Sequence, residues 1–286
     1  MNLRQTKQLL QSRRLAPHKR LGQNFLVHEH TARRIVAQAT ISPEDTVVEV
    51  GVGLGALTRP LAEVAAEVIG VEADSGIIRL HEELQDLPGN VRLVHGDILK
   101  INLAELYNPG ARLKIVANLP YSISTPFLFH LMEHKEVLHS AVIMLQKELA
   151  QRLCAQPGCK AYGAPTVLLA ACADVEELME VGPEEFHPRP QVDSTVLRLI
   201  FYPEPARLKH LGSFNQPLFS RIVRSAFAQR RKTLLNALSP LEANKTLLAA
   251  LLNRAGIAAT ARAETLTLAD FIRLSQVMSA EATTLS

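Results

Sequence analysis

Long hydrophobic runs are missing from this sequence. No stretch of about 18 apolar residues occurs, and that length is the minimum for a helix that spans a membrane. The first residues are basic, but the apolar core of a secretory signal does not follow them. Only three cysteines are present, and their spacing matches no disulfide framework, which is typical of the reducing cytoplasm. We therefore expect a cytoplasmic protein with no membrane segment.

A metal site also lacks support in the sequence. Cys154 and Cys159 form a C-x4-C pattern, but no second ligand pair completes a zinc site. We interpret these residues and Cys172 as structural thiols and expect no metal. At 286 residues, of which 47% are hydrophobic, the chain can bury a sizeable core in one large domain, or in one large and one small.

Acidic residues are absent from two stretches of the chain. Residues 1–28 carry six Lys/Arg and no acid, and residues 205–241 are also basic without any acid. Residues 44–105, by contrast, carry twelve Asp/Glu against four Lys/Arg. Ordinary solvated faces are one explanation of this distribution. Basic ends around an acidic middle are better explained by a polyanionic partner.

Short runs rich in β-branched residues alternate with helical patterns from residue 46 onward. Strands are predicted at 46–51, 67–72, 91–97, 114–118 and 139–145. Helical patterns begin at residues 56 and 75. This order predicts an α/β, Rossmann-like fold, in which a mostly parallel sheet carries helices on both faces. The run 192–202 is expected to add an antiparallel edge strand.

The chain changes character after residue 203. Pro203 and Pro205 interrupt any regular element there. Beyond them only helical periodicity occurs, at 217–238, 242–255 and 267–278. We therefore predict two domains: an N-terminal arm plus α/β domain over residues 1–203, and a small, basic, all-helical domain over residues 206–286.

A glycine-rich turn, E-V-G-V-G-L-G-A-L-T, joins the first strand to the first helix. Glycine allows a sharp turn and lets a ligand approach the backbone closely. In an open α/β sheet this turn borders the crevice where nucleotide-like ligands bind. Gly51, Gly53 and Ala56 also fit the dinucleotide fingerprint G-x-G-x-x-[GA], and Glu72 follows at a suitable distance for a ribose diol. A purely structural turn is the alternative.

Carboxylates follow successive strands of the predicted sheet. Glu49 and Glu72 belong to the first two strands, and Asp97 follows the third. Carboxylates accept hydrogen bonds from hydroxyl and amino groups, but they oppose phosphates. The crevice therefore favours a nucleoside cofactor without phosphate, which indicates S-adenosylmethionine. An NAD-dependent oxidoreductase is the less favoured alternative.

Strand 114–118 ends in the sequence N-L-P-Y at the same edge of the sheet. The side-chain carbonyl of Asn118 and the backbone carbonyl of Leu119 could both accept from one exocyclic amine, and Pro120 stiffens the loop. Tyr121 offers a flat face for stacking, as proteins do for extruded bases. We interpret this loop as a cradle for a planar base that bears an amino group. The alternative is a turn in which a serine caps the next helix.

Together these motifs resemble the KsgA/Erm family of S-adenosylmethionine-dependent rRNA adenine N6-dimethyltransferases, and its KsgA branch most. The matching stretches are L-G-Q-N-F-L (21–26), E-V-G-V-G-L-G-A-L-T (49–58), G-V-E-A-D (70–74), H-G-D (95–97), N-L-P-Y-S-I-S-T-P (118–126), M-L-Q-K-E (144–148), F-H-P-R-P-Q-V-D-S (186–194) and A-F-A-Q-R-R-K-T-L (226–234). They span nearly the whole chain. Val52 departs from the pattern, because the family usually has proline there, and this changes the stiffness of the loop.

The resemblance implies a role for each matched residue. Contacts with S-adenosylmethionine are implied for Asn24, Leu26, Gly51, Glu72, Asp97 and Asn118. Of these, Glu72 is implied to bind the ribose and Asp97 the adenine amino group. The target adenine is implied to lie at Asn118, Leu119, Pro120 and Tyr121, with Phe186 as a second stacking ring.

The resemblance also implies the substrate: two adjacent adenosines near the 3′ end of small-subunit (16S) rRNA, which are N6,N6-dimethylated during ribosome assembly. Erm enzymes, which methylate large-subunit rRNA, are the alternative within the family, and the long basic C-terminal region favours the KsgA branch. A non-catalytic assembly factor is a further alternative, which the intact Asn118 and Tyr121 disfavour. We expect a monomer that binds rRNA in an assembling particle.

The basic C-terminal region predicts one amphipathic helix over 217–238. Asn215 and Pro217 suit its start, and the Ser-Pro pair that follows suits its end. Four basic residues fall on one stripe of this helix: Arg221, Arg224, Arg231 and Lys232. Because no acid balances the stripe, contact with RNA phosphates is favoured over a solvated face. Arg230 falls among apolar residues and is expected to be structural.

Overall fold

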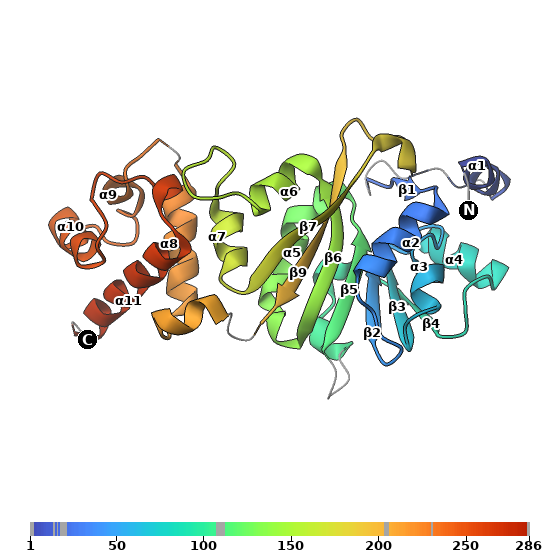
Figure 1. The fold of residues 1–286 in the computed structure, drawn as a ribbon, viewed down its shortest axis with the longest axis horizontal. Coiled ribbons are helices and arrows are strands. Elements are labelled where there is room, and N and C mark those ends of the chain that lie inside the picture. Colours follow the sequence, from blue (N-terminus) through green and yellow to red (C-terminus); the bar gives the residue numbers. More distant parts are fainter. Residues whose placement is uncertain are drawn as a thin grey trace. The chain divides into compact units, whose positions relative to one another are not determined.

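The structure is a computed structural model that describes residues 3–13, 15, 17, 22–106, 112–202, 206–229 and 231–284. The chain divides into two compact units. The first holds residues 1–150 and 174–202, and the second holds residues 151–173 and 203–286. Figure 1 shows the sheet of the first unit and the helices of the second. One junction lies near the boundary predicted at 203, whereas residues 151–173, predicted to belong with the sheet, cluster with the C-terminal helices.

The described residues of the first unit build a seven-stranded sheet in the order β4-β3-β2-β5-β6-β9-β7 (Figure 1). Its strands are β2 (Thr46–Val50), β3 (Glu67–Glu72), β4 (Val91–His95), β5 (Leu113–Asn118), β6 (Leu138–Gln146), β7 (Ala173–Val181) and β9 (Ser194–Phe201). The strands from β4 to β6 in this order run parallel to their neighbours. Val47 and Val48 of the central β2 are completely buried, because a parallel sheet is covered on both faces. The predicted Rossmann-like α/β fold is confirmed.

The sheet contains one edge strand more than predicted. β9 pairs antiparallel with β6, as expected for the run 192–202, but β7 lies beyond it at the edge. The sequence of β7, A-D-V-E-E-L-M-E-V, contains four acids and was not predicted to be a strand. Charged side chains are common on edge strands because they block pairing with other chains. Because of these charges, the segment lacks the apolar run from which the other strands were predicted.

The first unit also contains the helices α1 (Leu3–Ser12), α2 (Glu29–Gln38), α3 (Thr58–Ala62), α4 (Ser75–Leu84) and α5 (Ser124–Glu133), while α6 (Lys147–Leu153) continues into the second unit. Ile35 of α2 and Leu61 of α3 pack with Val68 and Val116 of the sheet in one buried cluster. α4 begins where the sequence predicts, because the Asp74 side chain accepts a hydrogen bond from the Gly76 N–H at 2.8 Å.

The N-terminal arm packs beside the glycine-rich turn. Leu10 of α1 shares a buried cluster with Leu54, Ile77 and Leu80. After α1 the arm forms the two-residue strand β1 (Phe25–Leu26), which pairs antiparallel with β8 (Phe186–His187). These contacts hold the arm against the loop that follows β2.

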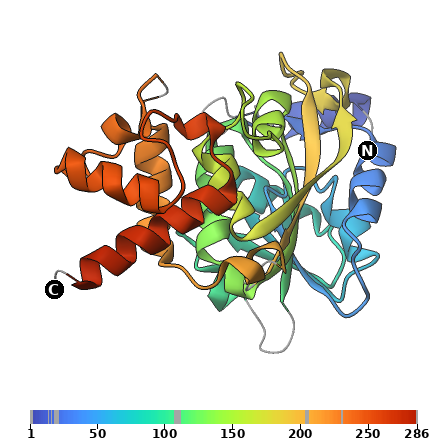
Figure 2. The same ribbon diagram turned by 60° about the vertical axis from the view of Figure 1, so that its left-hand side comes forward.

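The second unit is helical in its described residues. Its helices are α7 (Ala164–Ala170), α8 (Gln216–Phe227), α9 (Leu234–Ala237), α10 (Lys245–Arg254) and α11 (Leu268–Thr284). α8 packs against both α7 and α11 (Figures 1 and 2). The Tyr162 hydroxyl donates to the Leu266 carbonyl at 2.9 Å, which explains why the segment around α7 belongs to this unit. No helix in the described part of the chain is long and apolar enough to cross a membrane.

The prediction of a single helix over 217–238 is wrong for its C-terminal half. Asn215 caps α8 as expected, with its side chain accepting from Leu218 N at 2.9 Å, but the helix ends at Phe227. Thr233 is extended, and α9 begins with a backbone bond from Leu234 N to Ala261 O at 2.8 Å. Leu234 is completely buried. This tertiary packing overrides the local helical pattern. Arg230 lies outside the described residues.

Candidate active site

A cavity of about 260 Å³ lies at the carboxyl ends of β2, β3 and β5. Every residue predicted to contact the cofactor or the target base lines it: Asn24, Leu26, Gly51, Glu72, Asp97, Asn118, Leu119, Pro120, Tyr121 and Phe186. They come from segments far apart in the chain. Parallel strands deliver their carboxyl ends to one edge of a sheet, which is where α/β folds bind ligands.

The loop after β2 needs glycine for two reasons. Gly51 and Gly53 have φ values of 79° and 53°, a left-handed conformation that favours glycine. A Cβ atom at Gly53 would also lie 3.1 Å from the Phe25 ring of the arm. Val52 is buried, and a Cβ atom at Gly70 would lie only 2.6 Å from its Cγ2. A glycine in β3 therefore makes room for the valine that replaces the proline usual in the family.

Glu72 is a buried carboxylate held by two backbone N–H groups. Its Oε1 accepts from Asp74 N at 2.8 Å and its Oε2 from Gly53 N at 3.0 Å. Burial raises the pKa of Glu72, and these two hydrogen bonds oppose part of the rise. Each carboxylate oxygen has a second lone pair, so Glu72 can still accept from a pair of ribose hydroxyls.

Asp97 is exposed at the rim of the cavity. Its Oδ1 accepts from Leu99 N at 3.1 Å, which caps the short turn after β4. Ile98 and Leu99 line the cavity beside it. An apolar wall next to a carboxylate suits a flat heterocycle with an amino group at one end.

Glu49 also lines the cavity, but only 1% of its surface is exposed. No hydrogen bond of normal geometry reaches either carboxyl oxygen among the described residues, and the nearby Thr58 opposes only part of the effect of burial. Burial raises the pKa of Glu49 to about 8. The group is therefore mainly protonated at neutral pH, and it does not behave as the crevice carboxylate that the sequence predicted.

The N-terminal arm closes one side of the cavity by pairing its two-residue strand β1 with β8. Leu26 of β1 lies opposite Phe186 of β8, so the implied cofactor contact and the implied stacking ring are neighbours. Val27 N donates to Glu185 O at 2.9 Å and extends this pairing. Gln23 donates to the Asp74 carboxylate at 2.9 Å. The arm is thus tied to the loops that follow β3 and β7.

The Asn118 amide has a defined orientation. Its Nδ2 donates to the Asn24 carbonyl oxygen at 3.0 Å. A carbonyl oxygen can only accept, so the nitrogen of the amide must face it. The Oδ1 atom consequently remains as an acceptor at the cavity. This is the orientation that recognition of an exocyclic amine requires.

Tyr121 is positioned by a contact that the sequence analysis did not predict. Its hydroxyl and the Ser194 hydroxyl lie 2.9 Å apart, and Ser194 of β9 is completely buried. Burial raises the pKa of Tyr121, so the phenol stays protonated. Ser194 and Gln23 both occur inside motifs that resemble the family, but nothing in those motifs distinguished their positioning roles from those of their neighbours.

The charge of the cavity fits a cationic nucleoside. Its described lining contains the carboxylates of Glu72 and Asp97, the mainly protonated Glu49, and no Lys, Arg or His. Phosphates would meet no opposite charge there, whereas a sulfonium or ammonium group would be stabilised. The lining therefore fits S-adenosylmethionine better than a dinucleotide.

The predicted RNA-binding residues belong to the second unit. Arg221 and Arg224 lie on α8, whereas Arg231 and Lys232 lie in the segment between α8 and α9, and all four are exposed. The continuous helical stripe that the sequence predicted is therefore divided between a helix and a loop.

Comparison with known proteins agrees with this site. Residues 14–280 match the family model described as "Ribosomal RNA adenine dimethylase". A protein of Desulfotalea psychrophila, "Ribosomal RNA small subunit methyltransferase A", is 48% identical over 283 residues, which cover 95% of each chain. A protein of the same name from Bacillus cereus is 38% identical over 281 residues and covers 96% of this chain and 95% of its own.

Solved structures show the same architecture. A dimethyladenosine transferase from Plasmodium falciparum superposes with a TM-score of 0.75 at 26% identity, covering 90% of this chain and 98% of that one. The 23S rRNA methyltransferase ErmE superposes with a TM-score of 0.65 at 25% identity, covering 90% of this chain and 100% of its own. On the family match and the identity to its curated relatives, the chain belongs to the ribosomal RNA adenine dimethylases.

Proposed function

We propose that this protein transfers methyl groups from S-adenosylmethionine to N6 of two adjacent adenosines near the 3′ end of small-subunit rRNA, forming N6,N6-dimethyladenosine. The name of the curated relatives supports the small subunit as the substrate. The observation that carries the proposal is the Asn118 amide, whose Nδ2 is held by Asn24 O while Oδ1 remains an acceptor at an acid-lined nucleoside cavity.

S-adenosylmethionine supplies an electrophilic methyl group, and the protein has to place the adenine amine in line with it. The N6 lone pair is delocalised into the ring and is a weak nucleophile. Hydrogen bonds from N6 to Asn118 Oδ1 and to the Leu119 carbonyl would draw the nitrogen toward tetrahedral geometry and stabilise its developing positive charge. The methylated ammonium is acidic enough to lose its proton to water, so a dedicated general base is not needed.

The extruded adenine would be held by aromatic stacking. Tyr121 and Phe186 both line the cavity, and the contact with Ser194 fixes the direction of the tyrosine ring. Stacking on such rings contributes about 1–3 kcal/mol per base. Because N6 carries two hydrogens, the same geometry serves a second transfer once the base has been monomethylated.

The finer setting of the reaction also belongs to this proposal. We propose a monomer that acts in the cytoplasm on an assembling small-subunit particle, with residues 1–203 carrying the reaction and residues 206–286 binding RNA. The exposed Arg221, Arg224 and Arg231 of the second unit support the last part. Phosphate contacts of this kind position a protein on RNA without reading its sequence.

A labelling experiment tests the proposed function. The protein is incubated with methyl-labelled S-adenosylmethionine and, in separate reactions, with small-subunit precursor particles, naked small-subunit rRNA and large-subunit rRNA. We expect N6,N6-dimethyladenosine at two neighbouring positions near the 3′ end of the small-subunit RNA. Label confined to large-subunit rRNA, or no transfer to any of the substrates, would contradict the proposal.

The basic residues of the second unit are tested by two double variants, Arg221→Gln/Arg224→Gln on α8 and Arg231→Gln/Lys232→Gln in the following loop. Each lost phosphate contact should reduce the slope of log affinity against log salt by about 0.7–0.9. We therefore expect each double variant to bind substrate particles more weakly, with a salt slope that is smaller in magnitude by about 1.5. Filter binding between low and high salt measures this.

The matched control is Arg254→Gln/Arg273→Gln, which removes the same charge from the same unit. Arg254 pairs with Glu281 at 2.6 Å, and Arg273 pairs with Asp270, so both are already neutralised by carboxylates. This control should keep the parent's salt slope. If the double variants on α8 and in the following loop also keep the parent's salt slope, their basic residues form only a solvated face.

A further inference from the structure

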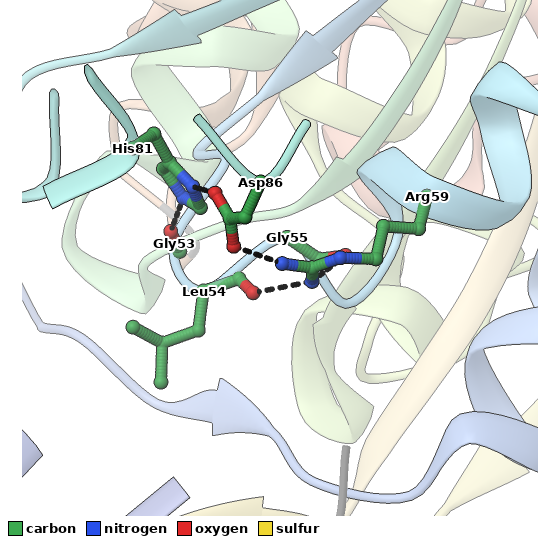
Figure 3. Close-up of polar contacts among 6 residues, drawn as sticks. All are labelled: Gly53, Leu54, Gly55, Arg59, His81 and Asp86. Carbon is green, nitrogen blue, oxygen red and sulfur yellow. Dashed lines mark hydrogen bonds and ion pairs between the residues drawn. The ribbon is translucent and has the colours of Figure 1, made fainter. Parts of the chain in front are cut away.

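A network of polar side chains that do not line the cavity binds the carbonyl groups of the glycine-rich loop (Figure 3). His81 of α4 places Nε2 2.9 Å from the Gly53 carbonyl oxygen and Nδ1 2.8 Å from Asp86 Oδ1. The other oxygen of Asp86 accepts from the Arg59 guanidinium. None of these three side chains lines the cavity, and no motif in the sequence singled them out.

The network ends on three consecutive carbonyl groups of the loop. Gly53 O accepts from His81, while Arg59 donates from one nitrogen to Leu54 O at 2.9 Å and to Gly55 O at 3.1 Å. Figure 3 shows Asp86 between the imidazole and the guanidinium, so that one carboxylate joins both donors. The whole backbone turn is therefore restrained by side chains from α3, α4 and the segment after α4.

Gly53 connects this network to the cavity. Its carbonyl oxygen accepts from His81, and its N–H donates to Glu72 Oε2 at 3.0 Å. A displacement of this residue would move the N–H that orients the Glu72 carboxylate. Gly53 and Gly55 both have positive φ values and no side chain to restrain them, so the loop depends on outside contacts for its shape.

The contacts are placed where they can act on the backbone. The His81 side chain is 2% exposed, and Asp86 and Arg59 are about one-third exposed or less. Hydrogen bonds are stronger when water is excluded, and linked side chains act as a unit. Because carbonyl and carboxylate oxygens only accept, both ring nitrogens of His81 are in donor positions, Nε2 toward Gly53 and Nδ1 toward Asp86.

We propose that His81, Asp86 and Arg59 are positioning residues that hold the Gly53–Gly55 turn in its ligand-binding conformation and thereby set the affinity for S-adenosylmethionine. They act through Gly53 and Glu72 and touch neither the cofactor nor the target base. The inference rests on the proposed cofactor site at Glu72, and its test is arranged so that the two can fail separately.

Two substitutions of His81 separate its two hydrogen bonds. The amide nitrogen of glutamine reaches about as far as Nε2, so His81→Gln retains a donor for Gly53 O. The amide of asparagine reaches only as far as Nδ1. His81→Asn therefore retains a hydrogen-bond partner for Asp86 but loses the hydrogen bond to Gly53 O. Asp86→Asn leaves one acceptor oxygen for two donors and should loosen both.

Affinity for S-adenosylmethionine and for the unreactive S-adenosylhomocysteine is measured by titration calorimetry. One lost hydrogen bond corresponds to a roughly three- to tenfold change in Kd. We expect His81→Asn and Asp86→Asn to raise Kd by about that factor, and His81→Gln to stay within about twofold of the parent. kcat at saturating cofactor should change little in all three, because the target-base contacts are intact.

Two controls complete the test. Arg33→Gln removes an exposed bidentate ion pair with Glu63 that makes no hydrogen bond to the loop carbonyls, and it should leave Kd unchanged. Glu72→Gln tests the site itself and should weaken cofactor binding. If Glu72→Gln weakens binding but His81→Asn does not, the positioning role is wrong and the site stands. If the Kd of every variant, Arg33→Gln included, follows its loss in Tm, the network is only structural. If Glu72→Gln binds normally, the cofactor site is wrong.

Discussion

Replacing Asn118 with alanine is expected to reduce kcat by about 10²–10³-fold, the usual cost of losing one preorganised group that stabilises transition-state charge. The structure gives the reason. Nδ2 is committed to Asn24 O at 3.0 Å, so Oδ1 is preorganised as an acceptor and needs no rearrangement when charge develops on N6. A single-turnover methylation assay with saturating S-adenosylmethionine measures the effect on chemistry.

The control for this variant is Asn102→Ala, which removes an exposed asparagine that caps a short turn in the same unit. It should cost a little stability and leave kcat unchanged. A thermal melt of Asn118→Ala should show a folded protein, with at most a modest loss from the contact with the arm. Turnover of Asn118→Ala near the parent's rate would mean that N-L-P-Y is only a turn between β5 and α5.

The raised pKa of Glu49 is expected to make the stability of the protein depend strongly on pH. Its folded pKa is about 8, whereas its ordinary value is 4.5. Below pH 4.5 the group is protonated in both states and contributes nothing. Between these two values the unfolded chain releases the proton more readily, so the free energy of unfolding decreases as pH rises. Above pH 8 the penalty is constant, at roughly 3–5 kcal/mol for a shift of this size.

Glu49→Gln removes the titration and keeps the shape of the side chain. Urea unfolding at pH 5 and pH 9 should show that the variant gains stability over the parent by ~3–5 kcal/mol between the two values. The comparison between pH values matters, because a buried amide carries its own constant cost. Glu44→Gln, at an exposed position, is the control and should show no such change. A difference between Glu49→Gln and the parent that does not vary with pH would contradict the burial of a protonated acid.

Much of the first unit could be predicted from local pattern. The strands β2, β3, β5 and β6 are rich in apolar and β-branched residues, since a parallel sheet covered on both faces needs apolar residues at most positions. β4 and β9 have shorter apolar runs that are interrupted by charged residues. The site residues were predictable for a related reason. Motifs at strand ends are delivered to one edge of such a sheet whatever the details of packing, so Glu72, Asp97 and Asn118 were expected together and lie together.

Elements that depend on distant contacts were not predictable in this way. β7 is an edge strand with four acids, and only its place beside β9 makes it a strand. α8 ends at Phe227 although the helical pattern continues, because burying Leu234 requires the chain to turn. The segment 151–173 joins the helical unit through Tyr162 and Leu266, which are 104 residues apart.

The sequence by itself determined the fold class, which follows from periodicity, and placed Glu72, Asp97 and Asn118 at one edge of the sheet, because their motifs lie at strand ends. Resemblance to the family supplied Asn24, Leu26 and Phe186. Tertiary structure decided what each group does there. It orients the Asn118 amide through a hydrogen bond to Asn24 O, buries Glu49 so that its pKa is raised, and brings His81 and Arg59 to the loop carbonyls. The direction of an amide, the protonation of an acid and the partner of a carbonyl depend on atoms brought close by folding, and spacing along the chain does not encode them.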